Sequence, residues 1–182
     1  MVTGATGGTG ACTVMCALAC GAARVIAVAR NRERLQKLKA LAPKRIVTLS
    51  SAESLREKIL KITENQGAGV LIDFVPNDPE TLQTAFACVQ RGGRIVPMGR
   101  GSEALSITLD QLTRNGWEVL GSTAAHLSDM ADLVELVRFG ALDLSGISAR
   151  TFPLEKANEA LQTVLDRPSS DIFCVGVRLG AQ

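Results

Sequence analysis

The sequence predicts an α/β fold, in which a doubly wound parallel sheet of six strands, in the order 3-2-1-4-5-6, carries helices on both faces. β-rich runs alternate six times with helical patterns, which requires right-handed crossovers between parallel strands. Some strand runs are apolar with little alternation, as expected when both faces of the sheet are covered. Aromatic residues make up only 3% of the 182 residues and there is no Tyr, so the core must be aliphatic.

The first half of this sheet is read from the N-terminus. A strand ends at Val2 and Thr3, and a run of glycines leads into an apolar helix over 11–19. A strand over 24–29, a helix over 31–42 and a strand over 46–49 follow. Ser50 and Glu53 have the spacing of a capping box, which predicts a helix from there to about Asn65.

The second half continues the alternation. A strand is predicted over 70–75, and Asp78 with Pro79 supplies an N-cap and an N1 proline for a helix to Gln90. Gly92 and Gly93 predict a turn into a strand over 94–98. A short helix over 110–115 precedes the sixth strand over 117–121. A helix over 128–139 should then face inward with its apolar side chains, Met130, Leu133, Val134 and Val137.

Two units are expected. Residues 1–144 form the sheet domain, and residues 145–182 add a strand, a helix and a strand that need a further surface to pack against. A central first strand of only two or three residues is also short. Both features lead us to expect a piece of a longer chain.

The glycine-rich turn at 4–10 is the first candidate for chemistry. Glycines between a strand and a helix let the backbone approach a ligand, and the helix N-terminus behind them attracts a pyrophosphate. This pattern is typical of the dinucleotide-binding turn of the Rossmann fold, the alternative being one of the glycine-rich turns that are common in proteins. The candidate residues are Gly4, Thr6, Gly7, Gly8 and Thr9.

The end of the second strand carries a second signal. An acidic residue that would bind the adenosine ribose is absent there, and Arg30, Asn31 and Arg32 follow the strand instead. Guanidinium groups bind a 2′-phosphate that a carboxylate would repel. These residues predict NADP(H) over NAD(H), the alternative being an ordinary solvated first turn of a helix.

Further cofactor contacts are expected at the carboxyl ends of the later strands. They are Phe74, Val75 and Pro76 after the fourth strand, Gly99 and Arg100 after the fifth, and Gly121 and Ser122 after the sixth. Asp73 is expected to be a structural carboxylate. No catalytic residue can be assigned. His126, the single histidine, is expected to be an exposed loop residue rather than one that faces the nicotinamide end.

Charge and cysteine usage narrow the class of protein. A net charge of +2 disfavours nucleic acid as a partner, and the eight Lys or Arg against one Glu in residues 24–45 suit a small anionic ligand. Cys12, Cys16 and Cys20 recur every four residues, and we expect buried thiols rather than zinc ligands, and so no metal. No stretch is long enough to span a membrane, and a reducing cytoplasmic location is expected.

Several motifs in order give a resemblance that covers essentially the whole chain. They are VTGATGGTG at 2–10, AARVIAVARN at 22–31, GAGVLIDF at 67–74, RGGRIVPMG at 91–99, GS at 121–122 and FPLEKANEAL at 152–161. Together they resemble the cofactor-binding half of medium-chain dehydrogenase/reductases, nearest to the quinone oxidoreductase and zinc-type alcohol dehydrogenase branches.

The resemblance implies hydride transfer between a nicotinamide cofactor and a ketone, quinone, enone or alcohol. In that family the catalytic zinc ligands and most substrate contacts lie on an N-terminal domain, which is missing here. The family's final segment returns to that domain, and its dimers often join near the sixth strand, here 117–121. A non-catalytic nucleotide-binding module for redox sensing or for a partner protein is the alternative, and an atypical short-chain reductase without its tyrosine is a weaker one.

Overall fold

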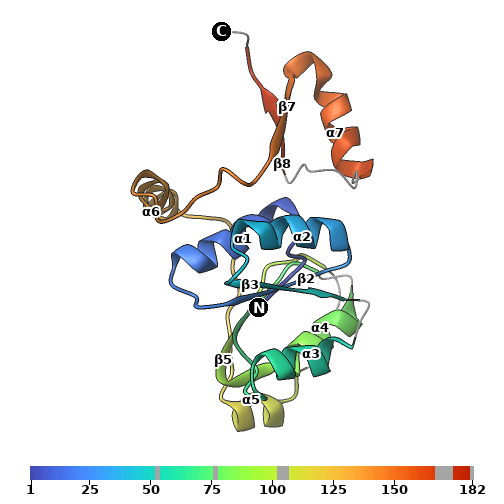
Figure 1. Cartoon of the computed structure of the whole chain (residues 1–182), viewed down its shortest axis with the longest axis vertical. Coiled ribbons are helices and arrows are strands. Elements are labelled where there is room, and N and C mark those ends of the chain that lie inside the picture. The colour runs from blue at the N-terminus through green and yellow to red at the C-terminus, as the bar shows by residue number, and fades with distance from the viewer. Residues whose placement is uncertain (52–53, 76–77, 102–106, 167–173, 181–182) are drawn as a thin grey trace.

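A computed structural model describes residues 1–51, 54–75, 78–101, 107–166 and 174–180. It confirms the expected class, because six parallel strands form one sheet in the order β3-β2-β1-β4-β5-β6. A second, two-stranded sheet pairs β7 with β8 in parallel. In Figure 1 this small sheet stands apart from the main body of the molecule.

The strands and helices alternate along the chain as the sequence predicts. The strands are β1 (Val2–Thr3), β2 (Val25–Ala29), β3 (Ile46–Ser50), β4 (Ala68–Asp73), β5 (Val89–Pro97), β6 (Glu118–Val119), β7 (Ala149–Pro153) and β8 (Cys174–Arg178). The helices are α1 (Gly8–Ala19), α2 (Arg32–Leu41), α3 (Leu55–Ile62), α4 (Pro79–Phe86), α5 (Leu109–Asn115), α6 (Leu127–Arg138) and α7 (Ala157–Asp166), with a 3₁₀ turn at Leu154–Lys156 before α7.

Helices cover both faces of the large sheet, with α1 and α2 on one side and α3 and α4 on the other (Figure 1). Strand β2 explains why both faces must be covered, since all five of its residues are buried. Val25 and Ala27 pack toward α1 and α2, whereas Ile26 and Val28 pack toward α3. This alternation follows from the two-residue period of a strand.

Two boundaries differ from the sequence prediction in the middle of the chain. Helix α4 ends at Phe86 rather than Gln90, and β5 already begins at Val89. Gly92 and Gly93 therefore lie within β5, where its pairing with β4 shifts register. A side chain on Gly93 would collide with the Gln90 carbonyl oxygen at 2.8 Å, so this irregular stretch requires glycine.

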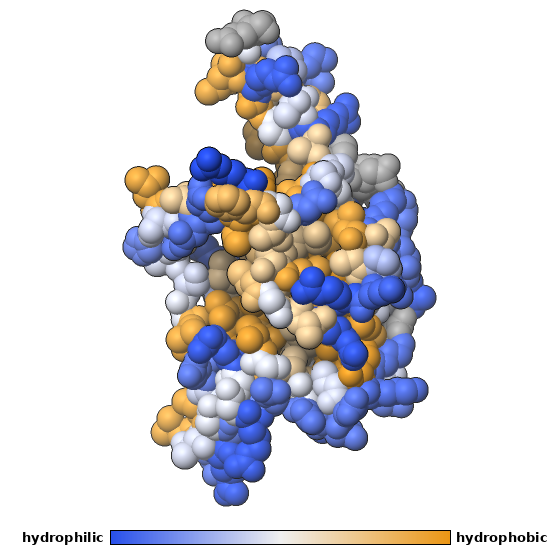
Figure 2. All heavy atoms as spheres, turned by 60° about the vertical axis from the view of Figure 1, so that its left-hand side comes forward, coloured by the Kyte–Doolittle hydropathy of each residue, from blue (hydrophilic) through white to orange (hydrophobic). Residues whose placement is uncertain are grey.

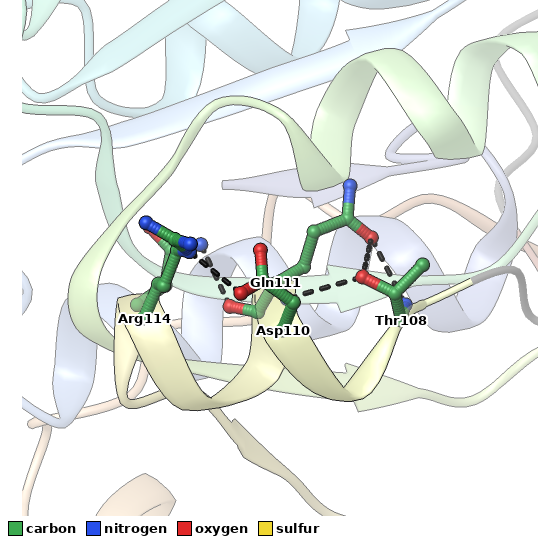
Figure 3. Close-up of polar contacts among 5 residues, drawn as sticks. Thr108, Asp110, Gln111 and Arg114 are labelled. Carbon is green, nitrogen blue, oxygen red and sulfur yellow. Dashed lines mark hydrogen bonds and ion pairs between the residues drawn. The ribbon is translucent and has the colours of Figure 1, made fainter.

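Helix N-termini show which capping signals the fold uses. Ser50 belongs to β3 and α3 begins only at Leu55, so a helix starting at Ser50 was a wrong prediction, while Glu53 lies outside the described residues. A capping box forms instead at α5, where Thr108 and Gln111 bond each other's backbone (Figure 3). An Asp110–Arg114 ion pair of 2.6 Å lies on the same helix.

Helix α6 contradicts the prediction that its apolar side chains face inward at three of the four positions, whereas Leu133 is half-buried. Met130, Val134 and Val137 are 51%, 58% and 46% exposed, and Leu127 at its start is 87% exposed. Its periodicity indicates a helix with an apolar face, but the described part of this chain does not cover that face.

The tail is a β-α-β unit, in which α7 joins the parallel strands β7 and β8. Ile147, just before β7, packs against the core under α1 and α2. Leu161, Val164 and Leu165 of α7 are more than half exposed. Figure 2 shows hydrophobic side chains at the surface of this upper part of the molecule.

The α1 cysteines are less buried than predicted. Cys12 and Cys16 are half-buried and Cys20 is exposed, because α1 directs Ala11, Val14 and Leu18 into the core instead. Of the five cysteines only Cys88 is buried. Among the described residues, no helix has the length and apolarity that a membrane crossing requires.

Candidate functional site

The glycine loop joins β1 to α1 by a sharp turn. Gly4 has a φ of +67°, and a Cβ there would lie 3.0 Å from the Cβ of Phe74. A Cβ on Gly10 would collide with the Gly4 carbonyl oxygen and lie 3.0 Å from the Ala5 Cα. The loop thus folds back so closely on α1 that both positions require glycine.

Helix α1 begins at Gly8 with Gly7 as its N-cap. Its first backbone N–H groups, those of Gly8, Thr9 and Gly10, have no acceptor within the helix. No acidic side chain lies in this first turn. The positive end of the helix is therefore available to an anion, in a position that a phosphate would suit.

A cavity of about 700 Å³ lies over this loop. It is lined by the loop and by the carboxyl ends of β2 and β4, the edge at which ligands bind in doubly wound sheets. Nine of the predicted site residues line it: Gly4, Thr6, Gly7, Gly8, Thr9, Arg30, Asn31, Phe74 and Val75.

Two arginines reach the cavity from the end of β2, and they are not the predicted pair. Arg30 and Arg34 line the cavity, whereas Arg32 does not. Asn31 caps α2 by accepting a hydrogen bond from the Arg34 backbone N–H at 2.9 Å. The Arg34 guanidinium is half-buried and donates to the Thr6 carbonyl oxygen at 3.2 Å.

Sequence reasoning missed Arg34, although a signal for it existed. With Asn31 as the N-cap, Arg34 occupies the third helical position. Side chains in a helix lean toward its N-terminus, so Arg34 points back toward the strand end. Arg32, the first residue of the helix, is exposed.

The remaining predicted contacts that the structure describes lie outside the cavity. Gly99 donates its backbone N–H to the Asp73 carbonyl oxygen at 2.9 Å, while Arg100 is exposed. Gly121 and Ser122 are exposed beyond β6. Pro76 lies outside the described residues. His126 is the exposed N-cap of α6, so its expected loop position is confirmed, and its N–H donates to Asp129 at 2.8 Å.

The tail supplies another wall of the cavity. Thr163 and Val164 of α7 and Val175 of β8 line it together with the glycine loop. Residues more than 150 positions apart in the sequence thus enclose one space. The wall is largely apolar, and it faces the start of α1.

A wider groove of about 1030 Å³ lies between α3 and α4 and shares Arg30, Ser51, Asp78 and Thr81 with the cavity. Its charged lining is balanced, since Arg30, Arg56 and Lys61 face Glu57, Asp78 and Glu80. It therefore offers an anion no net attraction, and the glycine-loop cavity is the better candidate site.

Buried Asp73 ties the ends of β1, β4 and β5 together, next in sequence to Phe74 and Val75 of the cavity lining. Asp73 is 2% exposed and lies opposite Thr3 in the β1–β4 ladder. Its carboxylate accepts hydrogen bonds from the Thr3 hydroxyl and from the Val75 N–H. Its carbonyl oxygen accepts from Met98 and Gly99 at the end of β5. This agrees with the structural role expected from the sequence.

Burial raises the pKa of Asp73, and the hydrogen bonds from Thr3 and Val75 only partly oppose this. Because the folded-state pKa lies above the unfolded value, its contribution to stability is fully present below about pH 3.9 and is lost as the pH rises through the folded-state pKa.

Asp73→Asn should therefore gain stability relative to wild type as the pH rises from about 4 toward neutrality. The amide can still accept from Val75 and donate to the Thr3 oxygen. Thermal melts of both proteins across this range measure the difference in Tm. A difference that stays constant or falls with pH contradicts the prediction, and Asp132→Asn, at an exposed position of α6, is the control.

Within the described residues, no three His, Cys, Asp or Glu side chains are grouped so that they could hold a metal ion. The site that the fold does build consists of a glycine loop, a helix N-terminus and two arginines at one sheet edge. These features define a nucleotide-binding protein of the Rossmann class.

Comparison with known proteins then gives the family. Residues 8–138, more than half of the chain, match the family model described as zinc-binding dehydrogenase, and the chain belongs to this family. The resemblance to the cofactor-binding domain of medium-chain dehydrogenase/reductases is thereby confirmed.

The relatives point to the same group. The chain is 27% identical over 165 residues to an NAD-dependent alcohol dehydrogenase of Sulfolobus acidocaldarius, covering 90% of this chain and 46% of that protein. It is 28% identical over 180 residues to a quinone oxidoreductase-like protein 2 homolog of Nematostella vectensis, covering 93% and 48%. The chain thus spans about half the length of the curated relatives it matches.

Among solved structures, an alcohol dehydrogenase from E. coli CFT073 complexed with NADH superposes with a TM-score of 0.79 at 21% identity. The match covers 99% of this chain and 51% of that one. At this identity the likeness shows the fold alone.

Proposed function

We propose that this chain is the NADP(H)-binding part of an oxidoreductase. The observation that carries the proposal is that the N-terminus of α1 and the side chains of Arg30 and Arg34 line one cavity. The first site suits a pyrophosphate and the second a 2′-phosphate. The family membership and a relative named as an NAD-dependent alcohol dehydrogenase support a nicotinamide dinucleotide as the ligand.

The roles of the residues follow from their places. The N–H groups of Gly8, Thr9 and Gly10 bind the pyrophosphate, and the missing Cβ atoms let it approach. Arg30 and Arg34 bind the adenosine phosphate, while Phe74 and Val75 form an apolar wall. A bound nicotinamide supplies the hydride that is exchanged with the substrate.

The tail and α6 are proposed to serve the remainder of a longer enzyme. Their apolar side chains at Leu127, Val134, Leu161 and Leu165 are 58% to 87% exposed. The relatives are about twice as long as this chain. We assign residues 1–144 to the dinucleotide-binding domain and 145–182 to a tail that packs on a catalytic domain.

The substrate class and assembly are part of the same proposal. Relatives include proteins named as alcohol dehydrogenases and as an acryloyl-coenzyme A reductase, which suit a ketone, quinone, enone or alcohol as substrate. The unpaired edge of β6, where Val119 and Leu120 are 37% and 44% exposed, is proposed to join two copies in a cytoplasmic homodimer. Sedimentation should show a dimer that Val119→Lys dissociates, and a monomeric wild type at high concentration contradicts this.

Thermal stabilisation by cofactor tests the proposal most directly. At 100 times its Kd, a ligand stabilises the fold by about 2.7 kcal/mol, which raises Tm by about 5–10 °C in a chain of this size. NADPH should give this shift at a lower concentration than NADH. Equal or better stabilisation by NADH removes the preference for NADP(H), and no shift with either removes the cofactor. ADP-ribose, which lacks the nicotinamide ring, measures how much of the rise in Tm comes from binding of the nucleotide alone.

A further inference from the structure

The groove between α3 and α4 adjoins the glycine-loop cavity at four polar residues. Arg30, Ser51, Asp78 and Thr81 line both spaces. Among the described residues that line the groove, none belongs to the glycine loop. The groove therefore begins near Arg30 and extends away from the N-terminus of α1.

The base of a dinucleotide needs a place close to Arg30. This step rests on the proposed function, in which the start of α1 binds the pyrophosphate and Arg30 binds the 2′-phosphate. In the adenosine half of the cofactor, the ribose carbon that carries the 2′-phosphate is bonded directly to the carbon that carries the base. The base must therefore lie close to Arg30, and the groove offers it space beside that residue.

The lining of the groove suits an uncharged, flat ring. Leu55, which is buried, and Leu60, which is half-buried, supply apolar surface. Arg56 of the same helix is exposed and also lines the groove, and bases stack on the plane of a guanidinium group. The charges that line the groove are balanced, so a neutral base enters it without a net electrostatic cost.

Asp78 is a hydrogen-bond acceptor held in a fixed orientation. Its carboxylate accepts from the Thr81 N–H at 3.0 Å and from the Thr81 hydroxyl at 2.8 Å. Thr81 is 7% exposed, so its side chain is held in place within the fold. The Asp78 N–H donates to the Val75 carbonyl oxygen at 3.2 Å. A carboxylate has about four lone-pair positions, so about two remain for a ligand.

We propose that the groove binds the adenine ring of the cofactor and that the Asp78 carboxylate accepts a hydrogen bond from its exocyclic amine. Adenine presents N–H donors at position 6 of the purine, whereas hypoxanthine has a carbonyl oxygen there. A carboxylate attracts the amine and repels the carbonyl oxygen. Asp78 is thus a specificity residue for 6-aminopurines and takes no part in hydride transfer.

Titration with NADPH and with nicotinamide hypoxanthine dinucleotide phosphate tests the proposal. Both carry the same pyrophosphate and 2′-phosphate, so the ratio of their dissociation constants isolates the contact to the base. Wild type should bind NADPH about 10- to 100-fold more tightly, because the hydrogen bond is charge-assisted. In Asp78→Asn the amide can donate as well as accept, so this variant should bind both within about threefold.

The wild-type titration separates this inference from the proposed function. If wild type binds both dinucleotides equally well, the groove does not recognise the amine, and the inference is wrong while the NADP(H) proposal stands. If wild type binds neither dinucleotide, the proposed function itself fails.

Glu80→Gln is the matched control. Glu80 is exposed and lines the groove but not the cavity, and its substitution removes the same charge as Asp78→Asn. It should change the affinity for both dinucleotides equally and keep the wild-type ratio. If it lowers the ratio as much as Asp78→Asn does, the charge of the groove is responsible and the assignment to Asp78 is wrong. Asn is as good an N-cap as Asp, so Asp78→Asn should melt close to wild type. If it does not, the wild-type ratio alone decides.

Discussion

Gly10→Ala is expected to lower Tm by about 2–12 °C, because the added Cβ would be forced into the glycine loop. The contacts it would meet are backbone atoms, the Gly4 carbonyl oxygen and the Ala5 Cα, which cannot rotate away. Relief requires α1 to move off β1, which displaces the N–H groups proposed to bind the pyrophosphate. Cofactor affinity should therefore fall at least about tenfold, measured by calorimetry below the melting range.

Gly7→Ser is the matched control on the same loop. Gly7 has an extended backbone, with φ −73° and ψ 161°, and a Cβ there meets nothing closer than the Gly4 carbonyl oxygen at 3.5 Å. Serine is also a favoured N-cap, so this variant should melt at or slightly above the wild-type temperature. If Gly10→Ala melts like Gly7→Ser, the close approach of the loop to α1 is wrong.

Loss of the Arg30 side chain should weaken NADPH binding about 10- to 100-fold and leave NADH binding nearly unchanged, since a charge-assisted hydrogen bond to a phosphate contributes about 1.5–3 kcal/mol. Arg30 is exposed at the mouth of the cavity, so Arg30→Ala should not alter stability. Titration of wild type and variant with both cofactors gives the ratio of dissociation constants.

Variants of Arg34 and Arg32 test which arginines bind the adenosine phosphate. Arg34 also donates to the Thr6 carbonyl oxygen, so Arg34→Met should weaken both cofactors through the loop, and NADPH more than NADH. Arg32 lies outside the cavity, and Arg32→Ala should change neither constant. If Arg32→Ala weakens NADPH binding the most, Arg32 binds the adenosine phosphate, as the sequence predicts, and the assignment to Arg34 is wrong.

The exposed face of α6 and the Asp73 network show two different consequences of packing. Buried Asp73 joins the ends of β1, β4 and β5 by hydrogen bonds within this chain. The apolar face of α6, in contrast, has no cover among the described residues. The Asp73 network positions the strand ends at the site. The apolar face of α6 is the surface against which we expect the rest of a longer protein to pack.

Local pattern in the sequence was enough for the sheet order and the glycine loop, and nine of the fifteen predicted site residues line the cavity. Both predictions depend on short stretches of sequence. A glycine that needs a positive φ, as at Gly4, leaves the backbone few alternatives, and so does an apolar run such as β2. Asp78 with Pro79 marked the start of α4 for the same reason.

Tertiary structure alone decided which side chains meet. The direction of α2 brings Arg34 rather than Arg32 to the cavity, and the return of the tail places Val175 beside the glycine loop. The same holds for α6, whose apolar period gives a face but not what covers it. The period of a helix determines which residues share one of its faces. Which segment packs against that face depends on residues spread over the whole chain.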